Sequence, residues 1–87
     1  MATVLLPRSL AALFPGVERR VDVSGATVGA VIEALDARWP GMRDRVCDST
    51  GTIRAFIHVY VDGEPAELLT AVSERSVIHV IPAVAGG

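Results

Sequence analysis

The sequence predicts an α+β fold in which one main helix packs on one mixed sheet of four to five strands. Runs that alternate apolar and polar residues with a period of two lie near the start, in the middle and near the end of the chain. One stripe with helical spacing lies between them. A single helix buries such a stripe most economically against one sheet. With 87 residues, the chain accommodates one domain with one modest core.

The first two strands are predicted in residues 2–7, "ATVLLP", and residues 17–25, "VERRVDVSG". In the second run, valines alternate with charged residues, which is the pattern of a half-buried strand. Pro15 and Gly16 interrupt the connection between the two runs and indicate a turn. The two strands are therefore expected to form a hairpin-like pair.

The main helix is predicted over residues 28–39. Its apolar stripe follows the spacing i, i+4, i+7 and i+11, in Val28, Ile32, Leu35 and Trp39. The Thr27 hydroxyl is suited to accept an unpaired backbone N–H at the helix start. Pro40 disfavours helical geometry in the residue before it, so the helix should end there. Residues 42–48 are expected to add one helical turn.

The strongest strand is predicted over residues 52–63, "TIRAFIHVYVDG", closed by the tight turn of Asp62 and Gly63. Its alternation places Ile57, Val59 and Val61 on the buried face. Residues 64–69 are expected to add a short edge strand, and residues 76–82, "SVIHVIP", the last strand. Pro82 is expected to end that strand, which divides the chain into a domain of residues 1–81 and a tail of residues 82–87.

Composition excludes several classes of function. The net charge of −2, with no clustered basic face in the sequence, argues against nucleic-acid binding. The apolar start of the chain is split by Pro7 and Arg8, so no signal peptide or membrane span is expected. The single Cys47 has no cysteine partner and no metal-ligand spacing around it, which indicates an ordinary small apolar residue and fits a cytoplasmic protein.

The element order, together with "PAVAGG" at residues 82–87, resembles the ThiS/MoaD family of ubiquitin-like sulfur carriers. Residues 25–35, "GATVGAVIEAL", resemble the start of the family's helix, and residues 56–64, "FIHVYVDGE", its third strand and turn. The resemblance implies a ubiquitin-like β-grasp fold with the first and last strands side by side in the sheet. One departure is the turn "SERSV", where Arg75 stands near the position of a family glycine and predicts a reshaped turn.

The resemblance also implies a chemistry at Gly87. An E1-like adenylating enzyme of the MoeB/ThiF type uses ATP to activate the terminal carboxylate, and sulfur then replaces AMP to give a thiocarboxylate. The carrier itself would be no enzyme, with no catalytic residue, no metal and no bound cofactor. Its tail is expected to be flexible and to thread a narrow channel, which glycine permits because it has no Cβ. The tail residues are Pro82, Ala83, Val84, Ala85, Gly86 and Gly87.

A partner surface is predicted on the outward face of the last two long strands. The alternation places Phe56, His58, Tyr60 and Ile81 there, and apolar residues gathered on one open face suggest a docking patch. His58 and His79 are interpreted as solvent-side strand residues rather than a paired site.

Within the family, the tail and the "HVYVDGE" run are most similar to the carriers of cysteine biosynthesis. That similarity implies a pyridoxal-phosphate enzyme as the sulfur acceptor, and a metalloprotease that trims the cysteine product from Gly87. Acceptors that lead to a thiosugar or another sulfur metabolite stay open. Two alternatives also stay open: a ubiquitin-like modifier conjugated through Gly87, and a β-grasp interaction module whose tail has no role.

Overall fold

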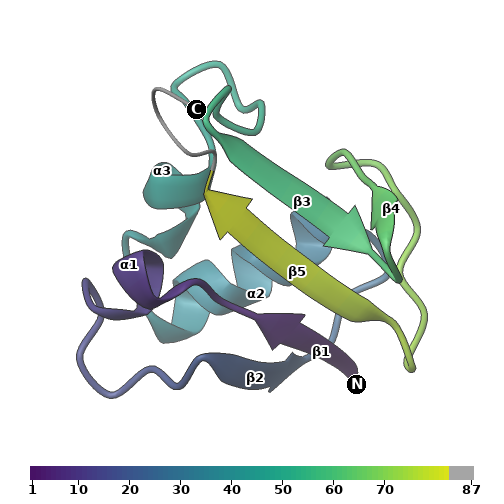
Figure 1. The fold of residues 1–87 in the computed structure, drawn as a ribbon, viewed down its shortest axis with the longest axis horizontal. Helices are drawn as coiled ribbons and strands as arrows, with labels where there is room; N and C mark the ends of the chain where they lie inside the picture. The colour runs from purple at the N-terminus through teal and green to yellow at the C-terminus, as the bar shows by residue number, and fades with distance from the viewer. Residues whose placement is uncertain (83–87) are drawn as a thin grey trace.

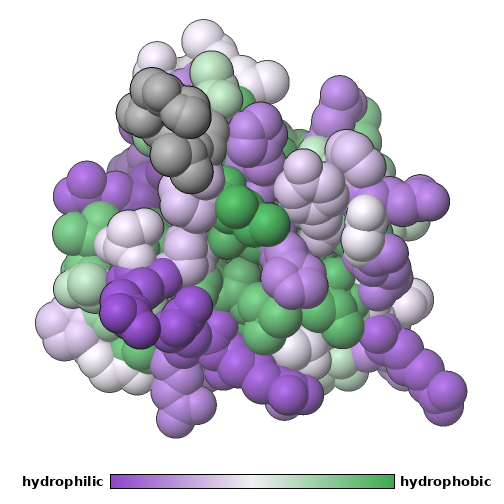
Figure 2. Space-filling model, viewed as in Figure 1, coloured by the Kyte–Doolittle hydropathy of each residue, from purple (hydrophilic) through white to green (hydrophobic). Residues whose placement is uncertain are grey.

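The computed structural model describes residues 1–82, which form one five-stranded sheet with three helices on one side of it (Figure 1). The strands are β1 (Ala2–Leu5), β2 (Arg20–Val23), β3 (Ile57–Val61), β4 (Glu64–Pro65) and β5 (Val77–Pro82). The helices are α1 (Arg8–Ala11), α2 (Val28–Arg38) and α3 (Met42–Val46). The other face of the sheet is open, and Figure 2 views the molecule from that side.

The strand order β2-β1-β5-β3-β4 places the first and last strands side by side near the centre of the sheet. β1 runs parallel to β5, while β2 pairs antiparallel with β1, and β3 antiparallel with β5. This is the ubiquitin-like β-grasp arrangement, so the α+β prediction and the mixed five-stranded sheet are confirmed. Asp62 and Gly63, with φ of 51° and 87°, form the tight turn between β3 and β4.

The core lies between α2 and the sheet. The predicted helical stripe is buried at Val28, Ile32 and Leu35, and Trp39 caps the helix end and packs partly buried against the core. From the sheet, alternate residues of β1, β2, β3 and β5 are buried toward the helices, and the same alternation leaves the intervening residues on the open face. The buried sheet residues include Val4, Val21, Val23, Val59, Val61, Ile78 and Val80.

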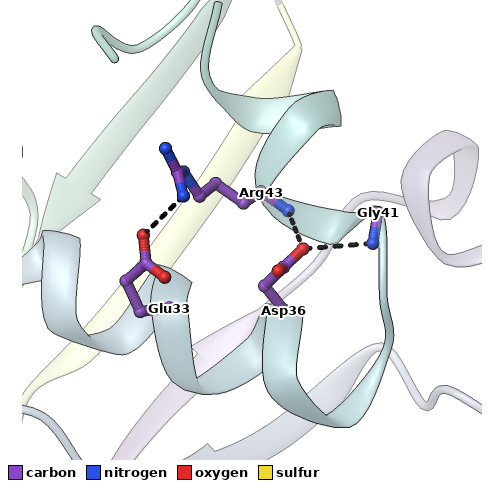
Figure 3. Close-up of polar contacts among 4 residues, drawn as sticks. All are labelled: Glu33, Asp36, Gly41 and Arg43. Carbon is purple, nitrogen blue, oxygen red and sulfur yellow. Dashed lines mark hydrogen bonds and ion pairs between the residues drawn. The ribbon is translucent and has the colours of Figure 1, made fainter.

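Asp36 fixes the junction between α2 and α3 (Figure 3). Its carboxylate accepts the backbone N–H groups of Gly41, at 3.1 Å, and Arg43, at 3.0 Å. Gly41 adopts a φ of 100°, which favours glycine and lets the chain reverse directly after α2. The Arg43 side chain also pairs with Glu33 at 3.2 Å. The junction presses α3 onto the core, where Met42 is fully buried.

The Thr27 cap predicted from the sequence is present, because the Thr27 hydroxyl accepts the Ala30 N–H at 3.1 Å. Thr27→Ala should lower the free energy of unfolding by about 1 kcal/mol, since it leaves one helical N–H without a protein acceptor. Urea-induced unfolding followed by circular dichroism measures this loss. Thr27→Ser keeps the hydroxyl and should retain most of the stability, so an equal loss in both variants would contradict the capping role.

The third long strand is shorter than predicted. β3 begins at Ile57 rather than at residue 52 or 53, because Ile57 already pairs with Pro82, the last described residue of β5. The preceding residues bind the end of α3 instead. Ile53 forms an isolated bridge with Cys47, and the Arg54 guanidinium donates to the Asp44 carbonyl at 2.8 and 3.1 Å.

The connection between β1 and β2 also differs from expectation, because it contains the short helix α1. Four residues are too few to show a helical period, so the sequence indicated only a turn there. In the turn before β5, the Ser76 N–H donates to the Ser73 carbonyl and the Ser73 N–H donates to the Ser76 hydroxyl. That this turn differs from the family's turn stays a prediction. Within residues 1–82, Asp62 is the only non-glycine residue with positive φ, so Arg75 needs no left-handed backbone.

Candidate functional site

The end of β5 is the point from which the predicted tail continues. Pro82 is the last residue of β5, where the sequence predicted the strand to end, and it lies opposite Ile57 of β3. β1 pairs with β5 only as far as His79, so beyond that residue β5 has an open side, where proline is tolerated. The boundary between domain and tail, drawn at residues 81 and 82, stays a prediction.

The remaining tail residues lie outside the described part of the chain. The flexibility predicted for residues 82–87 and the assignment of the reactive terminus to Gly87 therefore stay predictions. The tail residues outside the described part of the chain are Ala83, Val84, Ala85, Gly86 and Gly87. The structure does describe the surface around Pro82, the residue that precedes them in the sequence.

That surface is the open face of the sheet, and three of the four predicted surface residues share it. Tyr60 lies opposite His79, and His58 lies opposite Ile81, in the antiparallel pairing of β3 with β5. Residues directly opposite in such a pair project from the same face. Ile81 is 42% exposed, although large apolar side chains are mostly buried in folded domains. The phase predicted for these two strands is confirmed.

Phe56 was placed wrongly on this face. It lies in the turn before β3, where the strand alternation has not yet begun, and it is 59% exposed. It lines a separate groove of about 210 Å³, together with residues of α1, Arg45 and Pro82. Phe56 therefore flanks the end of β5 from the helix side of the sheet, away from Tyr60 and His58.

Leu5, Arg19 and Arg20 also line the site, and the sequence alone did not predict them there. They form a groove of about 460 Å³ together with Leu6, Pro7 and residues 79–82 of β5. Their position follows from the parallel β1–β5 pairing, in which Leu5 lies beside His79. Figure 2 shows apolar surface along the middle of this face, with hydrophilic side chains gathered over β2. The alternation in β1 could have placed Leu5 on this face. That Leu5 lies beside His79 could be known only from the order of the strands in the sheet.

Cys47 and the potential metal ligands are the other residues whose chemistry the sequence raised. Cys47 is 5% exposed, and burial raises the pKa of its thiol, so the reactive thiolate form is disfavoured. This agrees with its interpretation as an apolar residue. Within residues 1–82, no three His, Cys, Asp or Glu side chains gather as metal ligands would. The same residues contain no helix with the length and apolar character needed to cross a membrane.

Comparison with known families and curated proteins places this geometry in context. The model of the ThiS family matches residues 4–87. The sulfur carrier protein CysO of Mycobacterium tuberculosis is 35% identical over 98% of this chain and 91% of its own length. The small archaeal modifier protein 1 of Haloferax volcanii is 38% identical over 78% of this chain and 79% of its own length.

Solved structures show the same relationship. CysO in the Amycolatopsis orientalis BexX/CysO complex superposes with a TM-score of 0.89 at 32% identity, over 100% of both chains. CysO of Mycobacterium tuberculosis gives a TM-score of 0.88 at 32% identity, over 97% of this chain and 100% of that one. The small archaeal modifier protein 1 of Haloferax volcanii gives 0.79 at 34% identity, over 99% and 98%.

Proposed function

Because the chain belongs to the ThiS family and is a sulfur carrier of the CysO type, we propose that its Gly87 carboxylate is activated with ATP and converted to a thiocarboxylate. The observation that carries this proposal is the position of β5. A central strand of the sheet leads directly into the "AVAGG" segment, and the family match extends through Gly87.

The dimensions of the chain suit this role. Five residues beyond Pro82 can span at most roughly 17 Å when fully extended. A terminal carboxylate can therefore reach into a partner's active site while the folded domain stays outside it. The two glycines carry no Cβ, so they permit backbone angles and a channel width that other residues exclude.

A carboxylate carbon is a poor electrophile, and the proposed chemistry activates it by adding AMP as a leaving group. A Gly87 oxygen attacks the α-phosphorus of ATP, and pyrophosphate leaves. A sulfide sulfur then attacks the acyl carbon, the carbon–oxygen bond to AMP breaks, and the thiocarboxylate remains. An E1-like adenylating enzyme would bind the ATP, and this chain would act as a co-substrate rather than a catalyst. ATP and a reduced sulfur donor are both consistent with the cytoplasm.

The open face of the sheet is proposed as the docking surface for that enzyme. Ile81 and Tyr60 offer apolar contact area, and His58 and His79 offer polar groups beside them. Surfaces of this kind, with a partly apolar centre and polar neighbours, are typical of specific protein interfaces. The docked face lies next to Pro82, so the same partner can hold the domain and receive the tail.

Reconstitution tests the proposed activation. Purified protein is incubated with the E1-like enzyme of the same organism, ATP and sulfide, and AMP release is measured together with trapping of the thiocarboxylate by an alkylating reagent. AMP release and an alkylated terminal peptide, both dependent on ATP, would support the proposal. Absence of both products, with an enzyme that activates another carrier, would refute it.

For the sulfur acceptor, we favour an aminoacrylate held by a pyridoxal-phosphate enzyme, which would yield cysteine. The support is the similarity to CysO proteins, and a soft thiocarboxylate sulfur is a suitable nucleophile for that carbon. An S-to-N shift would leave cysteine amide-linked to Gly87, and a metalloprotease would release it. A terminal peptide ending Gly86-Gly87-Cys, formed from thiocarboxylated protein and an activated serine, tests this route. Transfer to a sugar precursor instead would assign another pathway.

Protein modification is the second candidate, and the similarity to the small archaeal modifier protein 1 favours it. Both functions share the activated Gly87 and differ in the attacking group, which is sulfur in one and a lysine amine in the other. Cell extracts distinguish them: a modifier yields isopeptide-linked conjugates that carry the Gly86-Gly87 remnant, whereas a carrier yields free thiocarboxylated protein.

A further inference from the structure

Both grooves beside the end of β5 are apolar and cationic. The groove of about 460 Å³ on the open face is lined by Arg19 and Arg20, and the groove of about 210 Å³ on the helix side by Arg45. Pro82 lines both grooves, and neither has an acidic lining residue. The point from which the tail continues is therefore surrounded by basic and apolar side chains.

A fourth arginine extends this arrangement. Arg8 follows Pro7, which lines both grooves, and it begins α1 at the same end of the sheet. We call Arg8, Arg19, Arg20 and Arg45 the cationic rim. All four are exposed, and the ion pair found within residues 1–82, Arg43 with Glu33, includes none of them. Glu18, exposed beside Arg19 in the sequence, lines neither groove.

The opposite end of the sheet carries the opposite charge. β3 runs antiparallel to β5, so the turn after β3 and the loop before β5 both lie at the far end from Pro82. Asp62, Glu64 and Glu74 are exposed there, together with Arg75. Although the net charge is only −2, the cationic rim lies at the tail end of the sheet, and Asp62, Glu64 and Glu74 lie at the other end, so the charge is polarised along the sheet. Glu18 and Asp44, exposed beside Arg19 and Arg45 in the sequence, offset only part of the rim's positive charge.

We propose that the cationic rim guides this chain tail-first onto an acidic rim around the channel of its activating enzyme. This proposal rests on the proposed function, because that function supplies the partner. Complementary charges around an interface mainly accelerate association and select the orientation of approach. A polarised molecule with a small net charge is turned by the partner's field rather than simply attracted by it. The partner is thus a protein with carboxylates around a narrow entrance, and the acidic end faces away from it.

The test compares two variants with the same substitution and the same change in net charge. Arg20→Glu reverses a charge in the cationic rim, and Arg75→Glu reverses one at the acidic end. Association with the E1-like enzyme of the same organism is followed by stopped-flow fluorescence at low and high salt. Arg20→Glu should slow association at low salt by roughly tenfold or more, and high salt should reduce the difference from wild type. Arg75→Glu should associate about as fast as wild type.

The outcomes separate this proposal from the proposed function. Equal slowing by both variants would show that only net charge matters, and unchanged association of Arg20→Glu would show that the rim has no role. Either result would overturn the steering proposal. The proposed activation would still stand if wild-type protein releases AMP with the enzyme. Failure of the wild-type protein to release AMP would instead refute the proposed activation itself. Thermal unfolding of both variants checks that the exposed substitutions leave the fold intact.

Discussion

Deletion of Gly87 is expected to abolish ATP-dependent activation and to leave the melting temperature unchanged. The deletion moves the terminal carboxylate back by about 3.5 Å along an extended chain. A misplacement of about 1 Å can already cost about 100-fold in rate, so a full residue should reduce adenylation below detection. The shortened chain keeps every core residue described within residues 1–82, so we expect the packing of that core to be retained.

Gly87→Ala is the matched control for reach, because it keeps the chain length and adds only a Cβ. Residual adenylation in Gly87→Ala, with none after the deletion, would show that the position of the carboxylate matters more than the identity of its residue. Pyrophosphate exchange measures adenylation, and differential scanning calorimetry measures the melting temperature. Wild-type adenylation of the shortened chain would contradict the assignment of Gly87.

Ile81→Arg is expected to weaken binding of the activating enzyme by about 30-fold without a large loss of stability. Truncation of a central interface anchor typically costs about 2 kcal/mol, which corresponds to that factor in the dissociation constant. Ile81 is 42% exposed on the open face, so a charged side chain there can reach solvent in the free protein. Titration calorimetry with the E1-like enzyme measures the affinity.

Ala71→Arg provides the matched control. Ala71 is exposed and pairs with Thr27 at the start of α2, and it lines neither the grooves beside Pro82 nor the concavity that contains His58 and Tyr60. The same type of change there should leave the affinity unchanged. Equal weakening by both variants would exclude a specific role of the open face, and a large fall in the melting temperature of Ile81→Arg would show that Ile81 supports the fold.

The sequence allowed the elements with clear periodicity to be predicted. Val28, Ile32 and Leu35 repeat over several turns, and Thr27 is a local capping signal, so α2 was correctly located. Phe56 was misplaced for the opposite reason. The residues around Phe56 continue the period-two pattern of β3. In the structure, however, Arg54 binds the end of α3, so this segment does not pair with the sheet. Residues before Ile57 can either continue β3 or bind α3, and the alternation of apolar and polar residues does not show which of the two they do.

In the candidate site, too, positions within a regular strand could be predicted, whereas neighbours across the sheet could not. His58, Tyr60 and Ile81 could be assigned to one face because each lies within a regular strand. Arg20 could not be assigned to the end of β5, since that position depends on the pairing of β2 with β1 and of β1 with β5. A surface formed by three strands from both ends of the chain is a property of the topology. The similarity to known carriers could be seen in "PAVAGG", whereas the cationic rim required the fold.

The central claim is that Gly87 carries sulfur, and intact-mass analysis of the protein isolated from its own cells tests it most directly. The account predicts a fraction of molecules whose mass exceeds that of the unmodified chain by the difference between one sulfur and one oxygen atom. Fragmentation should place that difference on Gly87, and alkylation should shift only this fraction. A protein that carries no sulfur at Gly87 under conditions of active sulfur assimilation, or that carries the added sulfur on Cys47, would contradict the account.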